Sequence, residues 1–273
     1  MFIFSNRTKQ KPFQLSHPSQ ECKLLSIVIP VYNEQETIEL TLQKLESLSI
    51  DCIDLIQLEV IIIDDCSQDD TPNQIKQFLD NSENKTKFIS IRHDKNRGKG
   101  GAVKTGFANA TGDIIIVQDA DLEYDSNEIP SVIEPILEGK ADVVYGSRFM
   151  VKKASRVLYY YHFLANKFLT FLSNLFTNMN MTDIETGYKA FRSEIIKNMI
   201  IHSWGFGFEV EVTAKIAKLN CRVYEVPISY YGRTYEEGKK IGLMDGVRAI
   251  FLIFYYNLFV NQKKSFQKDF LSK

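Results

Sequence analysis

Three acidic residues, each separated from the next by one residue, are the strongest candidates for a chemical role in this sequence. Asp119, Asp121 and Glu123 follow residues 114–117, which are four consecutive β-branched apolar residues. Such a run without polar alternation predicts a strand buried on both faces of a parallel sheet. Alternate residues of an extended backbone share a side, and carboxylate oxygens are suitable ligands for Mg²⁺ or Mn²⁺. The pattern therefore predicts a metal site just beyond this strand, where open α/β sheets bind ligands.

The same acids have a use that needs no metal. Asp commonly ends a strand and caps the helix that follows. A single Asp favours that use, whereas three acids at this spacing favour the metal. The natural partner of a metal held in this way is a diphosphate.

Polar residues also follow the first expected strand, residues 24–31. Pro30 lies near its end, and because proline cannot donate a hydrogen bond to a neighbouring strand, it marks where pairing stops. Tyr32 is placed to stack on a flat ring, and Glu34 to accept hydrogen bonds from one. Alternatively, Tyr32 covers the sheet and Glu34 is an acid at the start of the next helix.

The second expected strand, residues 58–63, ends in Asp64 and Asp65. Because the carboxyl ends of parallel strands meet at one edge, these acids are expected near Asp119. A carboxylate there can accept a hydrogen bond from a nucleobase N–H or a ribose hydroxyl. The alternative is a pair of ordinary loop acids. Thr71 with Pro72 next to it predicts that the following helix has Thr71 as its N-cap.

A basic, glycine-rich turn between residues 93 and 106 resembles two phosphate-binding motifs without matching either. The P-loop and the dinucleotide fingerprint both require glycine at the position of Val103. The turn is therefore expected to lead into a helix that ends near Asn109. Lys99 is placed to meet a ligand at the sheet edge, unless the turn is simply solvated.

Two arginines are candidates for binding phosphate. Arg148 ends the strand expected over residues 141–148, with a structural ion pair to one of the acids as the alternative use. Arg233 and Lys239 belong to a basic, glycine-containing loop that is placed to close over a phosphate, unless it is an ordinary solvated loop.

Composition limits the class of protein. The chain has 273 residues, 44% of them hydrophobic, which is enough for one large α/β domain with a mostly parallel central sheet flanked by helices. We expect a loose arm over 1–22, a main domain over 23–241 and a C-terminal helix with a basic tail over 242–273. With 33 basic and 34 acidic residues, no global charge points to nucleic acid. Four cysteines without CxxC spacing favour a reduced, cytoplasmic setting.

Two aromatic stretches, residues 157–177 and 249–260, stand out from the rest. Neither contains about 18 consecutive apolar residues, so no transmembrane helix is expected, but both have the aromatic content of helices that lie in a membrane interface. Lys263, Lys264 and Lys268 follow the second stretch, as in segments that rest on anionic lipid. The alternative is that the two helices pack on each other as a second core.

Several of these motifs together resemble family 2 glycosyltransferases of the GT-A fold, in particular the polyprenyl-phosphate hexose synthases. The resemblance covers about residues 24–258. The motifs that carry it are residues 28–34, Asp64-Asp65, residues 96–100, residues 119–122, Gly146-Ser147-Arg148, Asp183 with residues 186–189, and Arg233 with Gly238-Lys239.

The resemblance implies roles for individual residues. The candidates for binding the nucleotide sugar are Pro30, Tyr32, Glu34, Asp64, Asp65, Lys99, Asp119, Ala120, Asp121 and Lys239. The metal, Mg²⁺ or Mn²⁺, would be held by Asp121 with Asp119 and Glu123, although mannose synthases usually have Gln at the last position. The candidates for catalysis are Asp121, Arg148, Asp183 and Arg233.

The implied reaction is inverting transfer of a hexose from a UDP-glucose or GDP-mannose type of donor to a polyprenyl phosphate. The enzyme would lie peripherally on the inner face of the cell membrane. One alternative is transfer to a sugar hydroxyl, which requires a base, with Asp183 or Glu211 as candidates. Outside the class, a nucleotide-sugar-binding regulator or a P-loop-like ATPase shares some features, but Val103 argues against the latter.

Overall fold

The computed structural model describes residues 24–48, 57–82, 86–150, 156–157, 159–205, 207–234, 236 and 242–272. The predicted arm over 1–22 and Lys239 lie outside these residues. The strands are β1 (Leu24–Val31), β2 (Gln57–Asp64), β3 (Lys87–Arg92), β4 (Ile114–Val117), β5 (Val143–Ser147), β6 (Lys189–Arg192) and β7 (Val223–Pro227). The longer helices are α1 (Ile38–Glu46), α2 (Thr71–Asn81), α3 (Lys99–Asn109), α4 (Ile129–Leu137), α5 (Tyr160–Thr177), α7 (Phe208–Leu219) and α8 (Leu243–Leu258). Short helical segments are η1 (Ser126–Glu128), α6 (Ser193–Asn198), α9 (Gln262–Ser265) and α10 (Lys268–Leu271).

The described strands form one sheet in the order β3-β2-β1-β4-β6-β5-β7. All neighbours are parallel except β6, which is antiparallel to both β4 and β5. The expected mostly parallel α/β sheet is therefore confirmed, with β3 and β7 at its edges. The antiparallel β6 was not predicted, because it begins with Lys189 and ends with Arg192 and so lacks an apolar run.

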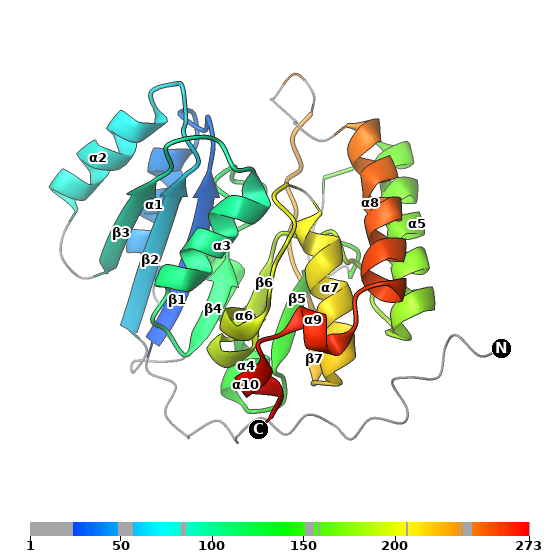
Figure 1. Ribbon diagram of the computed structural model, residues 1–273. Helices are drawn as coiled ribbons and strands as arrows, with labels where there is room; N and C mark the ends of the chain where they lie inside the picture. Colours follow the sequence, from blue (N-terminus) through cyan, green and yellow to red (C-terminus); the bar gives the residue numbers. More distant parts are fainter. Residues whose placement is uncertain are drawn as a thin grey trace.

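The alternation of side chains along the strands divides the hydrophobic core into two layers. Val28 of β1 faces the layer covered by α3, α6 and α7, whereas Ile27 and Ile29 face the layer covered by α1, α2 and α4. Figure 1 shows α5 and α8 side by side at the end of the molecule away from α2. Their contact includes Phe176 and Phe254, whose ring centroids are 5.1 Å apart. The predicted helices thus pack on each other along one side.

Two local expectations are wrong. The N-cap of α2 is Asp70, and Thr71 is already the first residue of the helix. The backbone after β4 does not stay extended, because it turns at Leu122, which has a φ of +59°. The turn is closed by a hydrogen bond of 3.1 Å from the Glu123 N–H to Asp121 Oδ1, an interaction that competes with strand geometry.

The C-terminal segment continues the main core. Phe266 and Phe270 are buried in the same hydrophobic layer as α3, and Phe266 pairs with Met199 in an isolated β-bridge. Lys263 and Lys264, which were expected to rest on lipid, are exposed on α9. Among the helices of the described part, none is both long enough and apolar enough to cross a bilayer.

Glu59 is a buried charge that ties three strands together at the end of the sheet away from the predicted site. Its carboxylate accepts hydrogen bonds from Ser26 Oγ at 2.7 Å, from Lys87 Nζ at 2.9 Å and from the Thr111 N–H at 2.8 Å. Burial alone would raise the pKa of Glu59, but these bonds lower it to about 2. The charged form therefore stabilises the fold.

We predict that Glu59→Gln lowers the free energy of unfolding at pH 7 by about 1.5–3 kcal/mol, because hydrogen bonds to a charged group are weakened. A depressed pKa adds stability that is complete above the unfolded-state pKa and is lost as pH falls from about 4.5 to about 2. Urea unfolding of both proteins between pH 7 and 3 measures this. Equal stability of the two at pH 7, or a difference that persists unchanged to pH 3, would contradict the assignment.

Candidate active site

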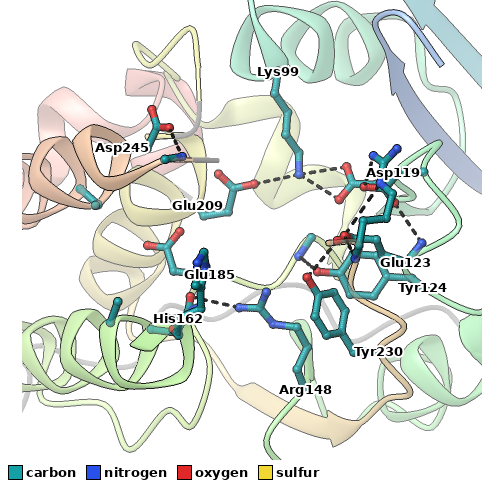
Figure 2. A pocket seen from close by; sticks show the side chains of 18 of the residues that line it. Lys99, Asp119, Glu123, Tyr124, Arg148, His162, Glu185, Glu209, Tyr230 and Asp245 are labelled. Atoms are coloured by element: carbon teal, nitrogen blue, oxygen red, sulfur yellow. Dashed lines mark hydrogen bonds and ion pairs between the residues drawn. The ribbon is translucent and has the colours of Figure 1, made fainter. Parts of the chain in front are cut away.

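A cavity of about 1060 Å³ opens at the carboxyl ends of β1, β2 and β4 (Figure 2). The predicted site residues that line it are Pro30, Tyr32, Glu34, Asp65, Lys99, Asp119, Ala120, Asp121, Glu123, Arg148 and Arg233. They come together because Val31 pairs with Asp64 and Val28 with Val117, so that the following acids reach one edge. Asp64 and Asp183 lie behind this lining.

The two acids that follow β2 have different surroundings. Asp64 is turned into the protein, where it accepts a hydrogen bond from the Ser67 N–H at 2.9 Å and pairs with Arg92 Nε at 3.1 Å. Asp65 lines the cavity and is held by His93 Nδ1 at 2.7 Å and by the Arg97 N–H at 2.8 Å. This geometry favours Asp65 over Asp64 as the ligand-binding acid.

His93 is a positioning residue that the sequence analysis missed. Its other ring nitrogen lies 2.8 Å from Thr105 Oγ1, so the ring is fixed between α3 and Asp65. The only available signal was that His93 directly follows β3 and therefore reaches the same sheet edge as the acids.

Lys99 links two walls of the cavity. It is the first residue of α3, after Gly98, whose φ of +72° suits glycine. Its Nζ lies 2.9 Å from Asp119 Oδ1 and 3.0 Å from Glu209 Oε1. Burial alone would lower the pKa of Lys99, but these two charges raise it well above its ordinary value. Lys99 is thus a permanent cation shared by two acids, and Glu209 was not among the predicted residues.

Arg233 crosses the cavity between the ends of β1 and β4. Its guanidinium lies 3.1 Å from Glu34 Oε2 and 3.2 Å from Asp121 Oδ2. Its backbone N–H donates to Glu123 Oε1 at 2.7 Å, and Tyr230 Oη donates to Glu123 Oε2 at 2.9 Å. Arg233 therefore contacts three acids of the site, and its binding of a phosphate stays a prediction. Within its predicted loop, residues 235 and 237–240, which include Lys239, fall outside the described residues.

The surroundings of Asp121 disfavour the negative charge of its carboxylate. Its burial, together with the negative charges of Asp119 and Glu123, raises its pKa to about 7, although Arg233 opposes this shift. The carboxylate therefore needs more positive charge than Arg233 supplies. A divalent cation meets that need.

The excess of negative charge around Asp121 is the observation that favours a bound metal ion at this site. Within the residues that the structure describes, no three or more His, Cys, Asp or Glu side chains form a ready cluster for one. Asp119 is engaged by Lys99, and Glu123 by Tyr230 and Arg233. Asp121 is the best placed ligand, and oxygens of a diphosphate would complete the coordination. Metal ligation by Asp119 and Glu123 stays a prediction.

Arg148 donates a fork of hydrogen bonds to Asp183, which holds its side chain in place. Its Nε and Nη2 donate to Asp183 Oδ2 and Oδ1 at 2.7 and 2.8 Å, and its backbone N–H donates to Oδ2 at 3.1 Å. The alternative interpretation of Arg148, an ion pair with an acid, is therefore present. Its Nη1, which has no hydrogen bond among the described residues, remains for a ligand.

The two candidate bases have surroundings that do not suit proton abstraction. Burial alone would raise the pKa of Asp183, but Arg148 lowers it below its ordinary value. Glu211 is paired with Lys215 and accepts the His202 and Ser203 N–H groups at 2.8 and 2.7 Å, away from the cavity lining. Neither acid is placed to meet an acceptor hydroxyl.

Gly187 lets two elements of the site approach closely. Its N–H donates to Tyr124 Oη at 2.8 Å, and a Cβ at this position would clash with Asp119 Oδ2. Tyr124 lines the cavity and stacks on Tyr188, with ring centroids 4.8 Å apart. Gly187 therefore packs directly against both Asp119 and Tyr124.

The other end of the same cavity is aromatic. Its lining there includes Phe149 and, from α5, Tyr160, Tyr161 and Phe163. Lys167 is a cation at this end, with its Nζ 4.3 Å from the ring centroid of Phe149. The cavity therefore runs from an acidic end at the sheet edge to an aromatic end beside α5, with Arg148 lining it between the acids and Phe149.

Comparison with known proteins agrees with this geometry. The family model described as "Glycosyl transferase family 2" matches residues 26–200. The chain belongs to glycosyl transferase family 2. It is thus a glycosyltransferase, and the fold is GT-A.

Curated relatives span most of the chain. An undecaprenyl-phosphate mannosyltransferase of Micrococcus luteus is 30% identical over 82% of this chain and 90% of its own length. A UDP-N-acetylglucosamine--dolichyl-phosphate N-acetylglucosaminyltransferase of Methanococcus voltae is 30% identical over 89% of this chain and 98% of its own. A dolichol-phosphate mannosyltransferase of Pyrococcus furiosus is 28% identical over 80% of this chain and 59% of its own.

Solved structures show the same fold. Glucosyl-3-phosphoglycerate synthase from Mycobacterium tuberculosis, in complex with Mn²⁺, UDP and its product, superposes with a TM-score of 0.62. The identity is 20%, and the match covers 86% of this chain and 80% of the other. A complex of the same enzyme with Mg²⁺ and UDP gives 0.61 at 21% identity, covering 86% and 79%. At this identity the likeness concerns the fold.

We predict that Mn²⁺ binds this family 2 enzyme in competition with a proton. Because the pKa of Asp121 is about 7, lowering the pH from 8 to 6 protonates the ligand and weakens Mn²⁺ binding about tenfold. Titration of free Mn²⁺ by electron paramagnetic resonance measures this without turnover. Asp121→Asn removes the binding, whereas the exposed Asp269→Asn leaves it unchanged; affinity that ignores pH or survives Asp121→Asn would contradict the assignment.

Proposed function

We propose that this glycosyltransferase moves a hexose from a nucleoside diphosphate sugar to a polyprenyl phosphate, with inversion at the anomeric carbon. The donor is of the UDP-glucose or GDP-mannose type. The relatives support this choice because three of them are transferases that act on undecaprenyl or dolichyl phosphate by name. The product serves the assembly of cell-envelope glycans or glycoproteins.

The observation that carries the proposal is the two-ended cavity. Its acidic end has an aromatic ring, Tyr32, and carboxylates for a nucleotide, Glu34 and Asp65, next to Asp121 for a metal-bound diphosphate. Its aromatic end beside α5 suits an apolar chain. A polyprenyl phosphate carries its anion at the end of such a chain, and Arg148 lines the cavity between the two ends.

The chemistry needs orientation more than proton transfer. An oxygen of the acceptor phosphate attacks the anomeric carbon, and the bond to the nucleoside diphosphate breaks with its electron pair on the leaving oxygen. The phosphate is already ionised at neutral pH, so no base is required. Arg148 and Arg233 hold the acceptor and donor phosphates, and Asp183 positions Arg148. A bound Mg²⁺ or Mn²⁺ would neutralise the diphosphate as it leaves.

Transfer to a sugar hydroxyl is the weaker candidate function. It requires a general base, and Asp183 and Glu211 are both held by cations. A nucleotide-sugar-binding regulator would need neither an apolar end of the cavity nor Arg148 beside it. The polyprenyl phosphate proposal uses both features.

We also propose that the enzyme lies on the inner face of the cell membrane through α5 and α8. Aromatic side chains remain exposed on the outer sides of both helices, with Tyr161 82% and Phe251 69% accessible. This exposed apolar surface, next to the aromatic end of the cavity, matches an interface with lipid. A carrier lipid would then enter the cavity from the membrane.

The test of the function is a panel of radiolabelled nucleotide sugars, incubated with the full chain, Mg²⁺ or Mn²⁺ and a short polyprenyl phosphate. We expect label in an organic-soluble, acid-labile product for one class of donor, and none without metal. Asp121→Ala is the matched inactive variant. Transfer only to a sugar hydroxyl, with no lipid product from any donor, would overturn the proposed acceptor.

We predict that Arg148→Lys raises the KM for polyprenyl phosphate, or lowers kcat, by about 10- to 100-fold, because one ammonium cannot both fork to Asp183 and reach the phosphate. Calorimetry without acceptor should show unchanged affinity for the nucleotide sugar. Asp183→Asn, which weakens the fork from the other side, should change the same parameter. A matching loss of nucleotide-sugar affinity would assign Arg148 to the donor instead.

We predict that the protein floats with anionic liposomes and that Phe171→Glu and Phe251→Glu reduce this binding without unfolding the chain. Both rings are more than 60% exposed, so a charge there costs little in the fold but much at a lipid surface. Tyr224→Glu, an exposed aromatic on the edge strand β7, is the control. Protein that never floats, or folded variants that float as well as the original, would contradict the membrane assignment.

A further inference from the structure

Two carboxyl groups on the α7 side of the cavity have oxygen atoms without a partner. Glu209, the second residue of α7, is 3% exposed and has Oε1 on Lys99, whereas its Oε2 is buried without a hydrogen bond among the described residues. Glu185 Oε1 is likewise buried without a hydrogen bond among the described residues. Both residues line the cavity, and Figure 2 shows them on the side opposite Asp119, Glu123 and Tyr124.

A buried acceptor without a donor is costly and calls for an explanation. The two neighbouring lysines do not supply the missing hydrogen bonds. Lys99 is shared with Asp119, and Lys189, which is fully buried, donates to the carbonyl of Thr186. Burial and the charge of Glu209 raise the pKa of Glu185 to about 7, so its carboxyl is able to accept or to donate a hydrogen bond.

The negative charge of Glu209 and Glu185 determines which part of the substrates can bind next to them. A diphosphate or an acceptor phosphate is repelled by two further acids, and an apolar chain cannot satisfy their oxygens. The expected nucleotide residues, Tyr32 and Asp65, come from the ends of β1 and β2. The remaining part is the donor hexose, which is uncharged and rich in O–H donors.

We propose that Glu209 and Glu185 form the hexose subsite of the donor, in which their free oxygens bind sugar hydroxyls and set the choice of sugar. The inference rests on the proposed function only in taking a nucleoside diphosphate hexose as donor. Lys99 links Glu209 to Asp119 across the cavity. The acids act on the sugar, while the nucleoside and diphosphate bind elsewhere in the cavity.

The experiment compares a nucleoside diphosphate with its sugar conjugate by calorimetry in Mg²⁺, without acceptor. The probes are UDP with UDP-glucose, UDP with UDP-N-acetylglucosamine, and GDP with GDP-mannose, and the pair that the original protein binds most tightly is used. We expect Glu209→Gln to weaken sugar nucleotide binding about tenfold or more and to leave diphosphate binding within about twofold. Glu185→Gln should act in the same direction, and the exposed Glu138→Gln is the matched control.

Deoxy analogues of the same sugar nucleotide supply a second measurement. Removing the hydroxyl that donates its hydrogen bond to Glu209 should weaken binding to the original protein, and should have no further effect in Glu209→Gln. Thermal unfolding of each variant confirms that it is folded.

Three results would overturn the subsite. They are equal affinity of the original protein for diphosphate and sugar nucleotide, an equal loss of both in the variants, or unchanged sugar nucleotide affinity in the variants. Failure of lipid transfer alone would instead overturn the proposed acceptor, because these binding measurements contain no acceptor.

Discussion

The crowding of carboxylates at the carboxyl ends of β1 and β4 is the constraint on which the rest of the site depends. Like charges packed this closely persist only with cations among them. Arg233 supplies one from beyond β7, and Lys99 supplies another from the start of α3. Segments that are far apart in the chain are therefore held together by charges at the candidate site.

This arrangement explains why the cations of the site are themselves restrained. Arg148 is fixed by Asp183 and Lys99 by Asp119 and Glu209, so each is aimed before a ligand arrives. Donor groups that are already oriented do not have to reorganise during a reaction, which is the main electrostatic contribution of a protein to catalysis. A transferase whose acceptor is already an anion depends on such orientation more than on a base.

The position of α5 and α8 joins the site to the expected surroundings of its acceptor. One side of each helix packs into the protein, through contacts such as Phe176 with Phe254, and the other side exposes aromatic rings. The interpretation of these stretches as a second core thus holds for one side of each helix, whereas the lipid-facing surface stays a proposal for the other side. Amphipathic helices have this property in general, because one face is buried while the other is free to bind.

The sequence by itself determined the parallel part of the sheet and the acids at its edge. Runs such as residues 114–117 have one stable use, burial on both faces, and the polar residues that follow must then meet where the strands end. The same reasoning found Arg148, which follows a strand, whereas Arg233 was singled out from its basic, glycine-containing loop. It could not find β6, whose Lys189 and Arg192 break the apolar pattern that strands are recognised by.

Only the tertiary structure decided which polar groups face the ligand. Asp64 and Asp65 are neighbours in sequence, yet one turns toward Arg92 and the other toward the cavity. Asp183 matched the motif of a catalytic acid but serves Arg148, and Glu209 and Glu185 matched no expectation but line the cavity with unpaired oxygens. The physical reason is that local sequence sets the direction of the backbone, whereas the partner of a buried charge comes from segments distant in the chain.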